Sequence, residues 1–198
     1  MILEGLMTTT NPDGTVNVSP MGPLVDESLT VFTLRPFQTS TTYRNLKRTG
    51  SGVFHVTDDV ELLARAAVGA LPSPPAVRQL PGSEAHVLVD ACRWFLLRVD
   101  ELDDHAERTT IVCRPVMSGE QRPYFGLNRA KHAVVEAAIL ATRLHLIPRE
   151  EVERQLVALR PLVEKTAGDA ERRAFAFLES YVAEYYARPA AAVEAGHG

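Results

Sequence analysis

Four successive hydroxyl residues beside two arginines are the part of this sequence best suited to binding chemistry. Arg35 comes shortly before them, and Arg44 comes shortly after them. Where a helix begins, its first turn offers unpaired N–H groups and the positive end of the helix dipole, and hydroxyl groups add donors. This combination is typical of a site for an anion such as phosphate. Alternatively, one hydroxyl caps the helix and the others are solvated. The hydroxyl residues are Thr39, Ser40, Thr41 and Thr42.

The elements that position this cluster can be predicted from the residues on either side of it. The segment Leu29–Arg35 is rich in β-branched and aromatic residues that alternate with others, which predicts a strand. Pro36 should end the strand because proline has no N–H to donate to a neighbouring strand. A helix is then expected to run to about Thr49, with Gly50 just after its end.

A second candidate site lies at the end of an expected hairpin. Residues 2–10 and 15–21 flank Asn11-Pro12-Asp13-Gly14, which is a strong turn signal. The second strand ends in Asn17-Val18-Ser19-Pro20-Met21-Gly22-Pro23, where two prolines and a glycine should stop the pairing. We expect free backbone N–H groups at Met21 and Gly22 and a surface of small residues that a flat ligand can approach. The alternative is a kinked strand exit.

The remaining segments complete a mainly β region that is followed by helices. A fourth strand is expected at 51–57, a helix beginning at Asp58 or Asp59, and a proline-rich loop at 71–82. Residues 91–102 and 107–116 look like a second hairpin that closes a barrel. From residue 126 the apolar spacing predicts three helices, the first capped by Asn128, with Pro161 kinking or interrupting the second. We therefore expect a barrel domain at 1–125, a helical subdomain at 126–188 and a disordered tail at 189–198.

Composition excludes several classes of function. The 198 residues carry a formal net charge of −4 and no cluster of Lys and Arg, which argues against nucleic-acid binding. No apolar run approaches the roughly 18 residues of a membrane helix, and a basic leader segment is absent, so a cytoplasmic protein without membrane contact is expected. The two cysteines, Cys92 and Cys113, lie in apolar segments and should be buried free thiols. GxGxxG, Walker A, HExxH and CxxC motifs are absent, and the histidines lack metal-ligand spacing.

Four stretches of the chain form a pattern that is specific in order and spacing. They are Ile2-Leu3-Glu4-Gly5, Asn17-Val18-Ser19-Pro20-Met21-Gly22, Leu34-Arg35-Pro36-Phe37-Gln38-Thr39-Ser40-Thr41-Thr42-Tyr43-Arg44-Asn45 and Phe125-Gly126-Leu127-Asn128-Arg129-Ala130. In these stretches the chain resembles the DUF447 proteins of the FMN-binding split-barrel superfamily, which also contains flavin reductase-like and pyridoxamine phosphate oxidase-like proteins. The resemblance spans nearly the whole chain. It implies a mainly β plus α fold, in which a six-stranded FMN-binding split β-barrel is followed by a C-terminal helical subdomain. It also implies a homodimer with one FMN per subunit near the interface.

The resemblance further implies which residues contact the cofactor. The isoalloxazine edge would lie against the backbone around Ser19 to Gly22, and the phosphate would lie on Arg35 and the hydroxyl cluster. Asn128 and Arg129 fit the family pattern as further candidates. The full set of implied cofactor-binding residues is Asn17, Ser19, Pro20, Met21, Gly22, Arg35, Thr39, Ser40, Thr41, Thr42, Asn128 and Arg129.

Two functions follow from this expectation. One is a flavin-dependent oxidoreductase, similar to flavin reductases, that acts on an unidentified small molecule without a side-chain acid or base. The other is a non-catalytic FMN-binding or sensing protein, with a link to tetrahydromethanopterin-dependent one-carbon metabolism. Split-barrel relatives that bind haem, oxidise pyridoxine phosphate or use deazaflavin F420 give lesser alternatives. Haem would need an axial ligand, for which His55 and His132 are the candidates.

Overall fold

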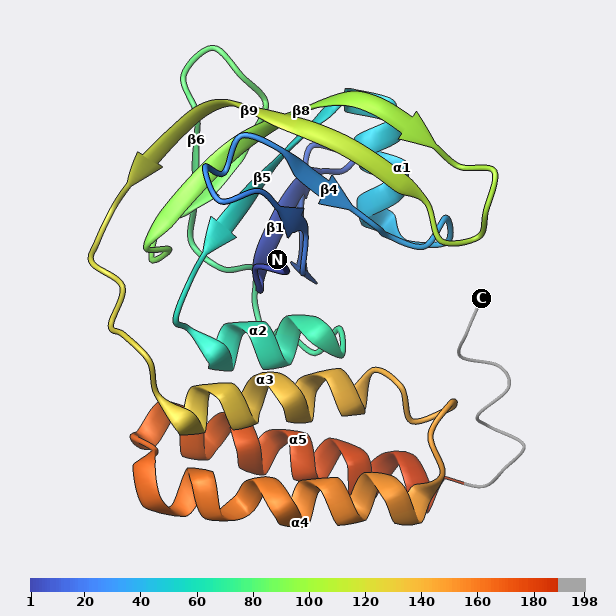
Figure 1. Ribbon diagram of the computed structural model, residues 1–198, viewed down its shortest axis with the longest axis vertical. Coiled ribbons are helices and arrows are strands. Elements are labelled where there is room, and N and C mark those ends of the chain that lie inside the picture. Colours follow the sequence, from blue (N-terminus) through green and yellow to red (C-terminus); the bar gives the residue numbers. More distant parts are fainter. Residues whose placement is uncertain (189–198) are drawn as a thin grey trace. The chain divides into compact units, whose positions relative to one another are not determined.

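The computed structural model describes residues 1–188, and the chain forms two compact units (Figure 1). The strand unit consists of Met1–Asp59 and Leu71–Phe125. The helical unit consists of Val60–Ala70 and the chain from Gly126 onward. The strand unit therefore ends at residue 125, and the segment 60–70 belongs to the helical unit. The tail expected at 189–198 lies outside the described residues.

A curled antiparallel sheet of seven strands dominates the strand unit (Figure 1). The β8–β9 pair carries two register shifts, and such irregularities bend a sheet. Six strands were expected; the additional one is β3, which has only two residues and so leaves no periodic signal. In the order of the sheet, the strands are β2 (Val16–Met21), β1 (Gly5–Thr10), β5 (Ser51–Val56), β8 (Arg93–Asp103), β9 (Thr110–Glu120), β4 (Phe32–Leu34) and β3 (Leu24–Val25).

Strand β4 is shorter than the predicted strand Leu29–Arg35 because a carboxylate interrupts it. The Asp26 side chain accepts hydrogen bonds from the backbone N–H groups of Thr30 and Val31, both at 2.8 Å. Leu29, within this loop, has a positive φ of 54°. These contacts hold residues 26–31 in a turn, so strand pairing begins only at Phe32.

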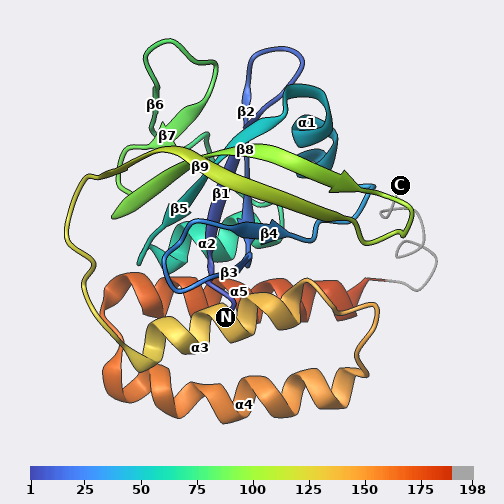
Figure 2. The same cartoon turned by 45° about the horizontal axis from the view of Figure 1, so that its top comes forward.

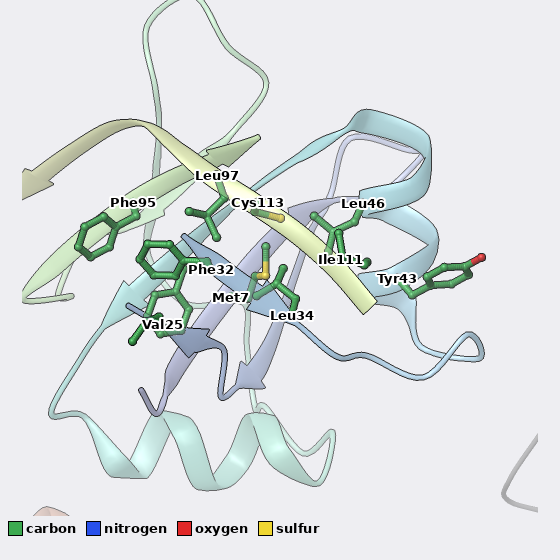
Figure 3. Close-up of a cluster of buried hydrophobic side chains, with 11 residues drawn as sticks. Met7, Val25, Phe32, Leu34, Tyr43, Leu46, Phe95, Leu97, Ile111 and Cys113 are labelled. Carbon is green, nitrogen blue, oxygen red and sulfur yellow. The ribbon is translucent and has the colours of Figure 1, made fainter. Parts of the chain in front are cut away.

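The concave interior of the sheet is filled by apolar side chains, most of which are shown in Figure 3. The helix α1 (Thr41–Thr49) contributes Tyr43 and Leu46 to this cluster. Cys113 is fully buried and Cys92 nearly so, and both are free thiols as predicted. Burial raises the pKa of the Cys113 thiol to about 12, which leaves it protonated and unreactive.

A two-stranded sheet covers part of the other face of the large sheet (Figure 2). It consists of β6 (Val77–Gln79) and β7 (His86–Leu88). Val87 packs with Val53 and Trp94 in a second apolar cluster. The segment 71–82 was expected to be a loop throughout, but it contains β6. This strand forms because its partner β7 is hydrogen-bonded to the main sheet. The proline-rich sequence of the segment does not indicate this pairing.

The described part of the helical unit, up to residue 188, contains four helices: α2 (Val60–Ala67), α3 (Arg129–Ala141), α4 (Arg149–Thr166) and α5 (Asp169–Ala187). The helix α2 packs against α3 and α5, and Arg173 of α5 forms an ion pair with Glu61 of α2 at 2.9 Å. Pro161 lies inside α4 and does not interrupt it, which leaves the kink as the predicted effect of this proline. Within residues 1–188, no helix is long and apolar enough to cross a membrane.

Candidate ligand-binding site

The two candidate segments of the strand unit meet through side-chain hydrogen bonds. Strand β2 pairs with β1 so that Asn17 lies opposite Thr9. The Asn17 amide Nδ2 donates to the hydroxyl oxygen of Thr42 at 3.2 Å, and the hydroxyl oxygens of Ser19 and Thr42 are 2.6 Å apart. Thr42 is only 3% exposed, whereas Asn17 and Ser19 are half-buried. Asn17 and Ser19 of β2 and Thr42 at the start of α1 therefore form one polar cluster.

This cluster keeps one hydroxyl hydrogen for a ligand. Ser19 and Thr42 together carry two hydroxyl hydrogens, and their mutual hydrogen bond uses one of them. Within the described chain no other acceptor is present for either hydroxyl group. Whichever residue donates, the remaining O–H group can therefore donate to an acceptor on a bound molecule.

Ser40, Thr41 and Thr42 make different hydrogen bonds at the start of α1. Ser40 is the N-cap: its hydroxyl oxygen accepts from the backbone N–H of Tyr43 at 3.2 Å and donates to the carbonyl of Phe37 at 2.8 Å. The alternative role of a hydroxyl as helix cap is thus correct for this residue. The backbone N–H groups of Thr41 and Thr42 have no partner within residues 1–188, which leaves two donors of the first turn available.

Three arginines surround this helix start. The exposed Arg44 folds back to donate to the Thr39 carbonyl at 3.0 Å and to the Thr41 hydroxyl at 3.1 Å. The exposed guanidinium of Arg35 makes no hydrogen bond or ion pair within the described part of the chain. Arg108 donates through Nε to the Arg35 carbonyl at 3.1 Å. Sequence reasoning missed Arg108 because it lies 73 residues from Arg35 and belongs to no motif.

The loop between β8 and β9 holds the segment 35–38 in place. The Gln38 amide donates to the carbonyls of Asp104 and Ala106, and the Thr109 hydroxyl donates to the Pro36 carbonyl. The Asp104 carboxylate accepts from Lys47 at 2.7 Å and from the Tyr43 hydroxyl at 2.6 Å. The Lys47 ammonium, followed by this hydroxyl, lowers the pKa of Asp104. Asp104 thus connects the tip of the β8–β9 hairpin to α1.

The end of β2 agrees with the strand predicted at 15–21. Pro20 and Met21 lie opposite Leu6 and Gly5, so the pairing with β1 extends to the end of this strand. Proline is compatible with this position because β2 is an edge strand of the sheet. Gly22 follows the strand and is exposed; a Cβ atom there would lie 3.0 Å from the Glu4 carboxylate, so a small residue suits this position.

Asn128 and Arg129 belong to the helical unit. The Asn128 side chain caps α3 by accepting from the N–H groups of Ala130 at 2.8 Å and Lys131 at 3.1 Å. Its amide nitrogen donates to the Thr166 carbonyl at 3.0 Å. Asn128 therefore has a structural role as a cap, as the sequence also indicated. Arg129 is exposed on the first turn of α3.

His55, one of the two histidines considered as haem ligands, uses both of its ring nitrogens in hydrogen bonds within the fold. His55 is fully buried, and its Nε2 accepts from the Leu88 N–H at 3.0 Å. Its Nδ1 therefore carries the hydrogen and donates to the Leu6 carbonyl at 3.2 Å. Burial lowers the pKa of His55 to about 4. With both ring nitrogens bonded, His55 cannot serve as an axial ligand, which excludes one of the two candidate haem ligands.

A cavity of about 310 Å³ lies at the opposite end of α1, beside Arg48 and Thr49. It occupies the gap where the pairing of β1 with β5 ends after Thr8 and Val53. Two of its lining hydroxyls already donate within the fold, Thr8 to the His86 carbonyl and Thr10 to the Glu84 carbonyl. We therefore regard the cavity as a polar gap next to the β6–β7 sheet and not as part of the candidate site.

Comparison with known proteins defines the class and then the family. The curled antiparallel sheet, with α1 and its hydroxyl cluster following β4, is a split-barrel fold. A family model described as "Protein of unknown function (DUF447) N-terminal domain" matches residues 3–122, and a second, described as "Protein of unknown function (DUF447)", matches residues 128–180. The chain belongs to the DUF447 family. The comparison with curated proteins finds no match.

Solved structures confirm the predicted fold. An FMN-bound DUF447 protein from Methanosarcina mazei is 23% identical, has a TM-score of 0.78, and the match covers 91% of this chain and 94% of that chain. The styrene monooxygenase flavin reductase of Pseudomonas putida S12 is 14% identical with a TM-score of 0.50, over 62% of this chain and 82% of that chain. Flavoredoxin from Methanosarcina acetivorans is 13% identical with a TM-score of 0.51, over 62% and 74%.

Proposed function

We propose that this protein binds FMN in its strand unit and uses it as a flavin-dependent oxidoreductase acting on a small molecule. The main support is the polar cluster in which Asn17 and Ser19 of β2 contact Thr42 of α1. These residues come from the two segments that the family resemblance associates with the two ends of FMN. A solved structure of the same family is described as FMN-bound, and its match extends over nearly the whole chain.

The groups at the start of α1 fit the phosphate end of FMN. A phosphate needs several donors and positive charge, and this region offers the free N–H groups of Thr41 and Thr42. The exposed guanidinium of Arg35 adds charge, and Arg44 and Arg108 lie against the same segment. The hydroxyl hydrogen left over on the Ser19–Thr42 pair provides a further donor.

The residues 19–22 are proposed to support the flat ring system. Pro20 has no N–H group, and Gly22 has no side chain that would keep a planar ligand away from the backbone. When bound, FMN would supply the hydride chemistry. The chain would bind and orient it and exclude water, and we name no side chain as an acid or base.

We also propose that the active form is a cytoplasmic homodimer with one FMN per subunit near the interface. Val116 and Met117 on β9 support a subunit contact because they are apolar and about half-exposed. Sedimentation should then give twice the mass of the chain, and a monomer at all concentrations would contradict this part of the proposal.

An absorption spectrum of the freshly purified protein tests the cofactor. We expect bands at about 370 and 450 nm, typical of oxidised flavin, and FMN in the supernatant after heating. A colourless protein that also fails to take up added FMN would contradict the proposal. Anaerobic addition of NADH or NADPH then tests turnover: bleaching of the flavin supports an oxidoreductase, and a stable spectrum with every donor supports a non-catalytic FMN-binding protein.

A further inference from the structure

We infer that Thr9 and Asn45 are positioning residues for the proposed FMN site, acting through Asn17 without touching the cofactor. Neither residue was among the sequence-predicted site residues. The inference rests on the proposed function, because it concerns how the chain prepares the polar cluster for a ligand. It follows from the hydrogen bonds behind Asn17.

Thr9 is the centre of a buried polar network. Its hydroxyl oxygen accepts from Asn17 Nδ2 at 3.2 Å and from Asn45 Nδ2 at 3.0 Å. The second hydrogen of the Asn45 amide is donated to Asn11 Oδ1 at 2.8 Å. Thr9 is 3% exposed and Asn45 is 2% exposed. The network thus joins β1, β2, α1 and the turn between the two strands.

The consequence is a fixed orientation of the Asn17 side chain. Both hydrogens of its amide are used, one on Thr9 and one on Thr42. An amide held at two points cannot rotate without losing one of these bonds. This leaves the Asn17 carbonyl oxygen as an acceptor and keeps one lone pair of Thr42 filled. The cluster therefore offers a ligand one acceptor and one hydroxyl hydrogen in a prepared arrangement.

The choice of residue types supports a role beyond packing. Asparagine is a poor helix former, yet Asn45 occupies the interior of α1 with its side chain buried. A buried threonine and asparagine are favourable only when their polar atoms are paired. A leucine and a valine would fill the same space without this requirement. The polar pair is explained if it orients Asn17 for binding.

Three single substitutions test the inference through the dissociation constant for FMN, measured by quenching of flavin fluorescence. Thr9→Val keeps the shape but removes the acceptor, and should weaken binding by about tenfold. Thr9→Ser keeps the hydroxyl and should stay within about twofold of the wild type. The matched control is Thr8→Val, which removes a buried hydroxyl on the other face of the same strand and should leave the affinity unchanged.

Thr9→Cys is a second variant if Thr9→Val does not fold. It differs from Thr9→Ser by one atom, and sulfur is a weak acceptor, so it should bind FMN more weakly than the serine variant. The double variant Asn17→Ala/Thr9→Val tests whether Thr9 acts through Asn17. It should bind no more weakly than Asn17→Ala alone, whereas additive losses would overturn the inference.

The outcomes separate the inference from the proposed function. A wild-type chain without affinity for FMN removes the proposed function and the inference with it. Wild-type binding together with unchanged binding by Thr9→Val removes only the inference. An equal loss in Thr8→Val and Thr9→Val would also overturn it, because the effect would then reflect the general stability of β1.

Discussion

Single residues with similar chemistry have different roles at the start of α1. Ser40 caps the helix, Thr41 accepts from Arg44, and Thr42 turns inward to Asn17 and Ser19. These hydroxyl groups are therefore not one set of equivalent donors. The charge for an anion must come from side chains that the fold leaves without partners. Arg35 has this property within the described chain.

Arg35→Ala should weaken FMN binding by about 10- to 150-fold, corresponding to the loss of about 1.5 to 3 kcal/mol from charged hydrogen bonds. Flavin fluorescence titration measures the change. Arg98→Ala provides the matched control because Arg98 is also exposed but lies on β8, opposite Arg114. An unchanged dissociation constant for Arg35→Ala would refute the proposed phosphate role of this residue.

At the scale of elements, one histidine connects three strands. His55 of β5 donates to Leu6 of β1 and accepts from Leu88 of β7, so the β6–β7 sheet is tied to the main sheet by a neutral imidazole. Its folded-state pKa of about 4 lies below its ordinary value of 6.5. Between these values the unfolded chain binds a proton that the folded chain does not bind. Stability therefore falls as the pH falls through this range.

The free energy of unfolding should decrease by roughly 3 kcal/mol from this group as the pH falls from 6.5 to 4, and the loss should level off below the folded-state pKa. Urea unfolding at several pH values, followed by fluorescence of the single tryptophan Trp94, measures it. In His55→Asn this contribution to the pH dependence should be absent, whatever the variant's absolute stability. His132→Asn is the matched control at an exposed position. A His55→Asn profile parallel to the wild type would contradict this prediction.

At the scale of the whole molecule, the chain crosses between the two units three times. The carboxylate of Asp58 lies next to one of these crossings and is hydrogen-bonded to a residue next to another. Asp58 lies next to the exit into α2, and its side chain is only 7% exposed. It pairs with Arg122 and accepts from the N–H of Phe125 at 2.8 Å, next to the exit toward α3. Within the strand unit, Asp58 therefore fixes the ends of both connecting segments.

Asp58→Ala should lower the free energy of unfolding of the strand unit by about 3 kcal/mol, because it leaves Arg122 without its carboxylate partner. This value is at the lower end of the usual cost of breaking a buried ion pair, because Arg122 is about one-third exposed. It should also make residues 122–128 more sensitive to proteolysis. Asp100→Ala removes an exposed pair with Arg114 at 2.7 Å and should cost less than about 1 kcal/mol. Equal effects of the two substitutions would show that the Asp58 contacts do not stabilise the unit.

Much of the local structure could be predicted from the sequence because it depends on neighbouring residues. The Asn11–Gly14 turn, the helix between Ser40 and Gly50 and the cap at Asn128 all follow from backbone preferences and short-range hydrogen bonds. The two candidate segments of the strand unit were also recognised from residue types and from the family pattern. Their membership in one polar cluster was not predicted by either.

The tertiary structure alone decided which distant residues meet. Arg108 contacts Arg35 across 73 residues and Asn45 contacts Thr9 across 36 residues, and no local pattern marks such partners. The same reason explains β3 and β6, which are too short to show a periodic pattern and form only because a neighbouring strand provides their hydrogen bonds. The sequence by itself determined the elements and the family, whereas the fold determined the network that joins β2 to α1.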